Sequence, residues 1–166
     1  MLKIIKERHG VDFDVENFSK QAGEKAFAAM EKDDLRIDQN LVSFLNELKK
    51  KGVLIALATS SLRWRVEQVL DMFAIRSYFT AIVTAEDVEE HKPNPAIFLK
   101  AASLLKADPK DCIVIEDAKA GIEGAKRANM KTVLFTGFHD EDDKQDADLT
   151  VKDFASLSVD ILEKLF

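Results

Sequence analysis

The sequence predicts an α/β fold, in which helices cover both faces of a parallel sheet, because short apolar runs alternate with helical patterns along most of its length. Each run is nearly continuous in apolar residues, which is typical of parallel strands buried on both faces. The runs lie at Val53–Thr59, Phe79–Thr84, Cys112–Glu116 and Lys131–Thr136. Ligands bind at the carboxyl ends of the strands in such sheets, so the polar residues ending the runs are the first candidates for a site.

Apolar residues at helical spacing predict helices before and between these runs. The predicted helices lie at residues 1–10 and 15–32, and around Leu41–Leu48, Arg65–Met72, Pro95–Leu105 and Gly121–Ala128. Gly52 ends one helix after a run of lysines, and Asn94 can cap a helix that has Pro95 at its first position. Gly121 allows its helix to approach the sheet closely, and Asn129 suits a left-handed residue after the last turn.

The composition is that of a soluble globular protein, with 46% hydrophobic and 33% charged residues. The net charge is −6, so the chain lacks the basic surface that binds nucleic acid or an anionic membrane, and neither partner is expected. The first residues lack the long apolar run of a secretory signal, which predicts a cytoplasmic location. Cys112 is expected to be a small buried hydrophobe. The acidic segment at residues 139–148 lacks the glycine and final glutamate of a calcium loop, and is expected to be solvated.

A hydroxyl cluster, Thr59 to Ser61, ends the first run and precedes a predicted helix. Hydroxyl and backbone N–H groups at such a turn can bind an anion, because the N-terminus of a helix is positively polarised. Ser and Thr are also the commonest N-cap residues, and for the cluster taken alone a helix cap is the favoured explanation. The strand-end rule draws attention in the same way to residues 84–87, after the second run.

Lys92 lies in the segment HKPNPAIF, where Pro93 and Pro95 stiffen the backbone around it. A lysine held rigidly at the edge of the sheet can neutralise a phosphate or a buried carboxylate. The alternative is a capped helix with a surface lysine. His91 is expected to be exposed and to have no role.

Glu116 and Asp117 end the third run as adjacent carboxylates. Two negative charges at the end of a buried strand are costly unless a cation compensates them. Magnesium is the natural candidate, because it prefers oxygen ligands and is commonly held by one or two carboxylates together with a substrate phosphate. The alternative is that the pair caps the next helix.

Three segments in this order, LIALATSS, HKPNPAIF and IVIEDAKAGIEGAKRANM, closely resemble the second, third and fourth motifs of haloacid dehalogenase-like hydrolases. Within that superfamily the chain is most similar to the β-phosphoglucomutase and phosphoglycolate phosphatase branch. The resemblance runs from about Asp38 to the C-terminus, with Ala118, His91 and Ala96 as departures from common family residues. It implies a Rossmann-like parallel sheet with a helical cap.

The resemblance also implies the roles of individual residues. Thr59 and the backbone of Ser60 would donate to a transferring phosphoryl group, Lys92 would steady its charge, and Glu116 with Asp117 would hold magnesium. The implied chemistry is phosphoryl transfer from a small phosphorylated metabolite through an aspartyl-phosphate, as in a phosphatase or a phosphomutase.

The nucleophile motif of the family, D-x-D-G on a buried strand, has no good match in this sequence. The pair Asp12 and Asp14 follows a charged stretch and no glycine-bearing loop comes after it. Asp14 fits better as the N-cap of a helix, with Phe13 packed on Phe18 as a hydrophobic staple. Residues 1–34 are therefore expected to form the C-terminal part of a helical cap, and residues 35–166 an incomplete core without a catalytic nucleophile.

In the family the strand that carries this motif lies between the strands ending at Thr59 and Glu116. Without it, these two strands would keep unpaired inner edges. Three explanations stay open: the two strands pair directly, a second copy or a partner segment fills the gap, or residues upstream of Met1 supply the strand. We expect non-standard pairing or association at this place. Three functions stay open: a phosphatase or phosphomutase completed from elsewhere, a non-catalytic module that binds an anion and magnesium, and a truncated gene product.

Overall fold

The computed structural model describes residue 17, residues 21–25, residue 29, residues 35–137 and residues 146–166. The chain divides into two compact units, Met1–Arg36 and Ile37–Phe166. In the first unit residues 21–25 are helical, within the helix predicted at 15–32. The predicted cap at Asp14 and its staple lie outside the described residues.

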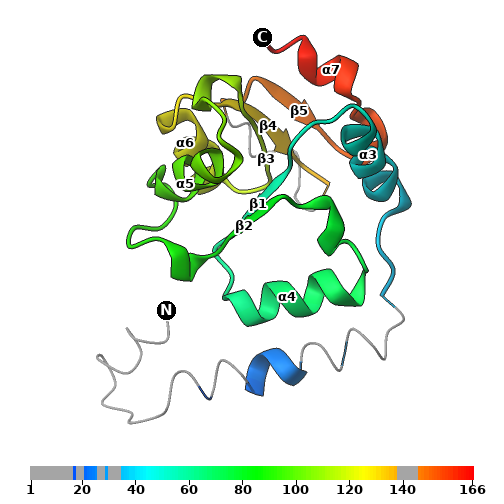
Figure 1. Ribbon diagram of the computed structural model, residues 1–166, viewed down its shortest axis with the longest axis vertical. Helices are drawn as coiled ribbons and strands as arrows, with labels where there is room; N and C mark the ends of the chain where they lie inside the picture. Colours follow the sequence, from blue (N-terminus) through cyan, green and yellow to red (C-terminus); the bar gives the residue numbers. More distant parts are fainter. Residues whose placement is uncertain (1–16, 18–20, 26–28, 30–34, 138–145) are drawn as a thin grey trace. The chain divides into compact units, whose positions relative to one another are not determined.

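The second unit alternates helices and strands, as the apolar runs predict (Figure 1). Its main helices and strands follow one another as α3 (Gln39–Lys50), β1 (Ala56–Ala58), α4 (Arg63–Met72), β2 (Ala81–Val83), α5 (Ala96–Leu105), β3 (Ile113–Glu116), α6 (Lys119–Arg127), β4 (Lys131–Phe135), β5 (Leu149–Val151) and α7 (Val159–Glu163). Short 3-10 turns η1 to η4 lie at Arg76–Tyr78, Ala85–Asp87, Pro109–Asp111 and Phe154–Ser156. Every strand pairing in the described part of the chain is parallel, so the α/β class is confirmed.

Helices cover both faces of the strands. Alternate residues of β3 enter different core clusters: Val114 packs with α5 and α6, whereas Ile113 and Ile115 pack with α3 and α7. Figure 1 shows the same arrangement, with α5 and α6 on one side of the strands and α3 on the other. The short apolar runs are therefore sandwiched between helical layers, which is the doubly wound arrangement.

The strands form two separate sheets within the described residues. β1 pairs with β2, and β3, β4 and β5 form a second sheet in that order, so β1 and β3 are not paired with each other. β2 is fully buried and β4 nearly so, whereas β1 and β3 are only partly buried. The predicted burial of the run Val53–Thr59 on both faces is wrong, since Val53 and Leu54 are 41% and 55% exposed. Within the described residues, no strand covers the second edge of β1 or β3.

β5 was not anticipated from the sequence. It begins beside Asp148, whose carboxylate accepts hydrogen bonds from the backbone N–H and hydroxyl of Thr132 at 2.8 and 2.7 Å. Thr132 is fully buried, so this pair fixes the start of β5 against β4. The acidic segment expected to be solvated therefore ends in a structural aspartate.

Helix ends follow the predicted signals. Gly52 and Asn129 have φ of +74° and +61°, the left-handed values expected after α3 and α6. Asn94 accepts a hydrogen bond from the N–H of Ala96, the first residue of α5, at 2.9 Å. Pro95 occupies the N-cap position, so the helix begins one residue later than predicted. None of the helices in the described part of the chain is long and apolar enough to cross a membrane.

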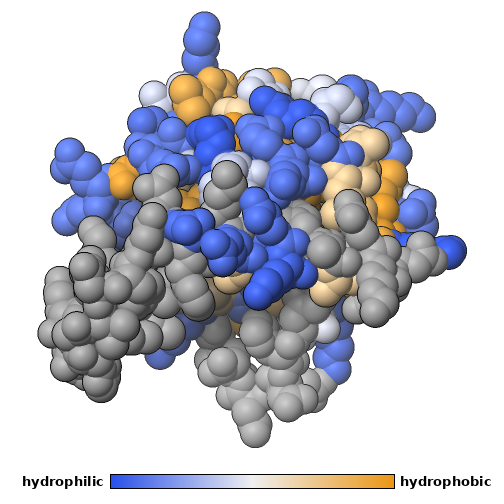
Figure 2. Space-filling view, turned by 90° about the horizontal axis from the view of Figure 1, so that it is seen from below, coloured by the Kyte–Doolittle hydropathy of each residue, from blue (hydrophilic) through white to orange (hydrophobic). Residues whose placement is uncertain are grey.

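Hydrophilic side chains cover much of the described surface seen in Figure 2, with smaller apolar areas between them. Large hydrophobic side chains that are exposed are scattered over several elements, at Leu35, Val53, Leu54, Leu62, Leu99, Leu104 and Phe166. Scattered exposure of this kind is ordinary for a folded domain. Val53 and Leu54 are the exception, because they lie just before β1, one edge of which no strand of the described residues covers.

Candidate active site

The ends of β1 and β3 meet at one lysine. The ammonium of Lys92 donates to Glu116 Oε1 at 2.6 Å and to the carbonyl oxygen of Ala58 at 3.3 Å. The side chains of Lys92 and Glu116 are only 12% and 14% exposed, so water screens the ion pair weakly. The structure thus brings together Lys92 and Glu116, which the sequence could only place at the same edge of the sheet.

The segment around Lys92 is held by its neighbours. The ammonium lies 4.9 Å from the centre of the Phe98 ring on α5, a cation–π distance. The guanidinium of Arg127 donates to the carbonyl oxygen of Pro93 at 3.2 Å, which ties the segment to α6. The alternative of a surface lysine is therefore wrong, because Lys92 is largely buried and has defined partners. His91 is exposed, as predicted.

Glu116 lies directly against Gly121. A Cβ atom at Gly121 would lie 1.7 Å from Glu116 Oε1 and 2.1 Å from its Cγ, so no other residue fits without moving the carboxylate. The sequence predicted that Gly121 allows close approach of a helix to the sheet. In the structure the close approach is to one side chain, that of Glu116, which binds Lys92.

Asp117 follows Glu116 and is exposed, and its N–H donates to Glu116 Oε2 at 3.3 Å. Helix α6 begins at Lys119 with Ala118 in the N-cap position, so neither carboxylate stands where a helix cap would. The capping alternative for this pair is therefore wrong. The end of β3 therefore carries two adjacent carboxylates, of which Glu116 is paired with the ammonium of Lys92.

The loop after β1 presents hydrogen-bond donors. The hydroxyl oxygen of Thr59 accepts from the N–H of Ser61 at 3.1 Å, which leaves the hydroxyl hydrogen free to donate. Ser60 is exposed and makes no hydrogen bond with the described residues, so its N–H and hydroxyl are also available. The N-cap of α4 is Leu62, so the hydroxyl cluster is not the helix cap.

The N-terminus of α4 is not open to a ligand in the way the sequence suggested. The first N–H of α4, at Arg63, donates to Glu86 Oε2 at 2.6 Å. Glu86 belongs to η2, the 3-10 turn Ala85–Asp87 that follows β2. The N–H of Arg63 is therefore not available to an anion at this loop, whereas the donors of Thr59 and Ser60 are.

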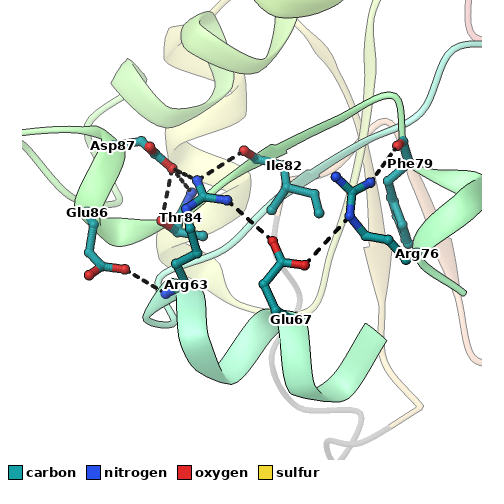
Figure 3. A network of polar contacts seen from close by, with 8 residues as sticks. All are labelled: Arg63, Glu67, Arg76, Phe79, Ile82, Thr84, Glu86 and Asp87. Carbon is teal, nitrogen blue, oxygen red and sulfur yellow. Dashed lines mark hydrogen bonds and ion pairs between the residues drawn. The ribbon is translucent and has the colours of Figure 1, made fainter. Parts of the chain in front are cut away.

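A polar network connects the loops after β1 and β2 (Figure 3). The guanidinium of Arg63 donates to Asp87 Oδ2 at 2.5 Å, and Asp87 also accepts from the N–H and hydroxyl of Thr84 at 2.7 and 2.9 Å. These hydrogen bonds, first that from the Thr84 N–H, hold the pKa of Asp87 below its usual range. The strand-end rule pointed to residues 84–87, but no local signal showed that they bind Arg63.

The donor set at the end of β3 fits magnesium in part. Glu116 and Asp117 offer hard carboxylate oxygens, and magnesium commonly takes one or two protein carboxylates and completes its shell with water and phosphate. No cluster of three or more His, Cys, Asp or Glu residues that could hold a metal occurs within the described residues. These two residues alone would therefore bind magnesium weakly, with a phosphate ligand needed to complete the site.

Comparison with known proteins gives a family match over residues 3–135, to haloacid dehalogenase-like hydrolases. Among curated relatives, the chloroplastic 5-amino-6-(5-phospho-D-ribitylamino)uracil phosphatase of Arabidopsis thaliana is 32% identical over 142 residues, 86% of this chain and 38% of that protein. Hexitol phosphatase B of Escherichia coli is 36% identical over 86 residues, 52% of this chain and 39% of the relative. The chain spans 38% to 58% of the length of the first curated relatives it matches.

Solved structures show the same fold. CbbY from Rhodobacter sphaeroides in complex with phosphate gives a TM-score of 0.83 at 23% identity, over 92% of this chain and 70% of that chain. β-Phosphoglucomutase from Clostridium difficile gives a TM-score of 0.75 at 29% identity, over 92% of this chain and 68% of that chain.

Proposed function

Because the chain belongs to the haloacid dehalogenase-like hydrolases, we propose that its site serves magnesium-dependent phosphoryl transfer from a small phosphorylated metabolite, as in a phosphatase or a phosphomutase. The observation that carries the proposal is the position of Lys92, whose ammonium contacts the end of β1 and the carboxylate at the end of β3. A phosphate bound beside the loop after β1 would lie near this positive charge.

Thr59 and Ser60 would bind the phosphate through the Thr59 hydroxyl and the Ser60 N–H, which the described residues leave free. Lys92 would neutralise part of its charge, in a setting where limited water contact strengthens the interaction. Glu116 and Asp117 would hold magnesium, which supplies further charge neutralisation to the phosphoryl group when it is bound. The relatives named above include phosphatases of phosphorylated small molecules, which supports this substrate class.

We place the nucleophile on a strand between β1 and β3, outside the described residues. The incomplete burial of both strands and the lack of pairing between them support this placement. The nucleophile would come from a partner segment, since a second copy of this chain could fill the gap between β1 and β3 but has the same sequence and so no good match to the motif. This chain alone would then be inactive. We assign residues 1–34 to the end of a helical cap and residues 35–166 to the core.

A non-catalytic module that binds an anion and magnesium is the second candidate. It is favoured by the ion pair of Lys92 and Glu116, which satisfies both charged groups without a ligand. Such a protein would bind phosphate at the same residues and would stay inactive when a completing strand is supplied.

Hydrolysis of p-nitrophenyl phosphate with magnesium tests the placement of the nucleophile. We expect no turnover by this chain alone, and turnover that Asp14→Asn abolishes would show that the nucleophile lies within residues 1–34. Sedimentation of the same sample reports whether a second copy associates.

Titration of inorganic phosphate with magnesium, followed by the amide NMR signals of Thr59 and Ser60, tests the anion site. Lys92→Met should weaken binding by about tenfold or more, because hydrogen bonds to charged groups contribute about 1.5–3 kcal/mol. Lys106→Met removes the same charge from an exposed residue at the far end of α5 and should leave the affinity unchanged. Phosphate binding that leaves both amide signals unmoved would contradict the proposed site.

A further inference from the structure

The loops after β1 and β2 are joined backbone to backbone beside the proposed phosphate site. The N–H of Thr59 donates to the carbonyl oxygen of Val83 at 3.0 Å, and the N–H of Ala85 donates to that of Ser61 at 3.3 Å. These bonds bracket Ser60, whose donors are free within the described residues. The shape of the loop is therefore set partly by the segment that follows β2.

Arg63 also connects these two loops, through its backbone N–H and its side chain. Its N–H donates to Glu86, and its guanidinium donates to Asp87 at 2.5 Å and to the carbonyl oxygen of Ile82 at 3.4 Å (Figure 3). The N-cap residue Leu62 has no side-chain acceptor, so Glu86 provides the cap of α4 from another loop. The first residue of α4 is thus held through both its backbone and its side chain.

Asp87 is itself fixed in place. Its carboxylate accepts from the N–H and the hydroxyl of Thr84, which is fully buried, and its carbonyl oxygen accepts from the ammonium of Lys100 at 2.8 Å. Hydrogen bonds to the buried Thr84 and to Lys100 on α5 restrict the movement of Asp87. Arg63 is therefore attached to a rigid point rather than to a mobile surface acid.

We propose that Arg63, Glu86 and Asp87 are positioning residues that hold the loop from Thr59 to Ser61 in its anion-binding shape. The inference rests on the phosphate role proposed for that loop. The three residues act through the loop and do not bind the phosphate. Their net charge is negative, so their electrostatic effect opposes anion binding, and their contribution is geometric.

Charge and geometry predict opposite results for one variant, which makes the inference testable. Asp87→Asn removes a negative charge, so an electrostatic effect alone would tighten phosphate binding. Loss of positioning would instead weaken it by about tenfold, within the range by which residues without ligand contact modulate binding. Glu86→Gln should act in the same direction. Glu89→Gln is the matched control, because Glu89 is exposed, has no partner within the described residues and carries the same charge.

Arg63→Gln, compared with Arg65→Gln, tests the other side of the network. Both substitutions remove one positive charge from the first turns of α4, but among the contacts of the described residues only Arg63 binds the loop after β2. We expect Arg63→Gln to weaken binding of inorganic phosphate by about tenfold and Arg65→Gln to change it by less than about twofold. Opposite shifts for Arg63→Gln and Asp87→Asn would show a purely electrostatic role and overturn the inference.

Hydrogen exchange of the Thr59 and Ala85 amides decides the inference independently of phosphate. Each of these amides donates across the two loops, so Asp87→Asn and Arg63→Gln should speed their exchange by about tenfold, whereas the two controls should not. Unchanged exchange in both variants would overturn the inference. A wild-type chain that binds no phosphate would instead refute the proposed function, while the exchange rates would still report whether the network holds the loop.

Discussion

Replacement of Gly121 by alanine should destabilise the protein, although alanine is the better helix former. Within α6 the change from glycine gains about 1 kcal/mol of helix propensity. The new Cβ would lie 1.7 Å from Glu116 Oε1, so the carboxylate must leave its position 2.6 Å from the Lys92 ammonium. Breaking a largely buried pair costs about 3 kcal/mol, the lower end of the range for such pairs. The net expectation is a loss of about 2 kcal/mol.

Urea unfolding followed by the fluorescence of Trp64 measures this change. The sign should reverse in a Glu116→Ala background, where the clashing side chain is absent and Gly121→Ala should stabilise by about 1 kcal/mol. A stabilising effect of Gly121→Ala in the wild-type background would refute the reasoning, because it would show that the carboxylate moves without cost.

Three further predictions concern the charged residues. Lys92→Met should lower the free energy of unfolding by about 3 kcal/mol, because it leaves Glu116 unpaired, and the exposed control Lys106→Met should change it by less than about 0.5 kcal/mol in the same urea series. The hydroxyl of Thr132 holds the pKa of Asp148 below its usual range, so the stability that this carboxylate contributes is present above about pH 4 and is lost as the pH falls through its lowered pKa. Asp148→Asn should therefore flatten the acid limb of a plot of urea midpoint against pH, and an unchanged slope would contradict this role. Asp117→Ala should weaken magnesium binding in the presence of phosphate by about tenfold in calorimetric titration, whereas Asp111→Ala, at the other end of β3, should leave it unchanged.

The α/β class could be predicted from the sequence because most strands have a signal within their own residues. A run such as that ending at Glu116 is short, apolar and followed by a helical pattern, and these signals depend on neighbouring residues alone. β5 was not predicted because Leu149–Val151 has only two apolar residues, separated by a threonine, and follows an acidic segment, so it lacks a continuous apolar run. The exposure of Val53 and Leu54 also escaped, since burial depends on which strand lies alongside and not on the composition of the run itself.

The residues of the candidate site could be proposed from the sequence, but the contacts between them could not. Lys92 and Glu116 could be assigned to one edge of the sheet, yet their 2.6 Å contact spans 24 positions along the chain. The capping of α4 by Glu86 spans 23 positions and replaces a local cap that the sequence does not provide. Contacts of this length are made by the tertiary fold, so no motif of adjacent residues encodes them.

The two contacts of Lys92 connect the two sheets. Its ammonium binds the last carbonyl of one sheet and the carboxylate that ends the other, so a single side chain bridges the open ends of two sheets that are not hydrogen-bonded to each other within the described residues. A ligand that draws the ammonium toward itself must weaken that bridge. Anion binding should therefore change the distance between the two sheets, and a change in that distance should alter the affinity for the anion.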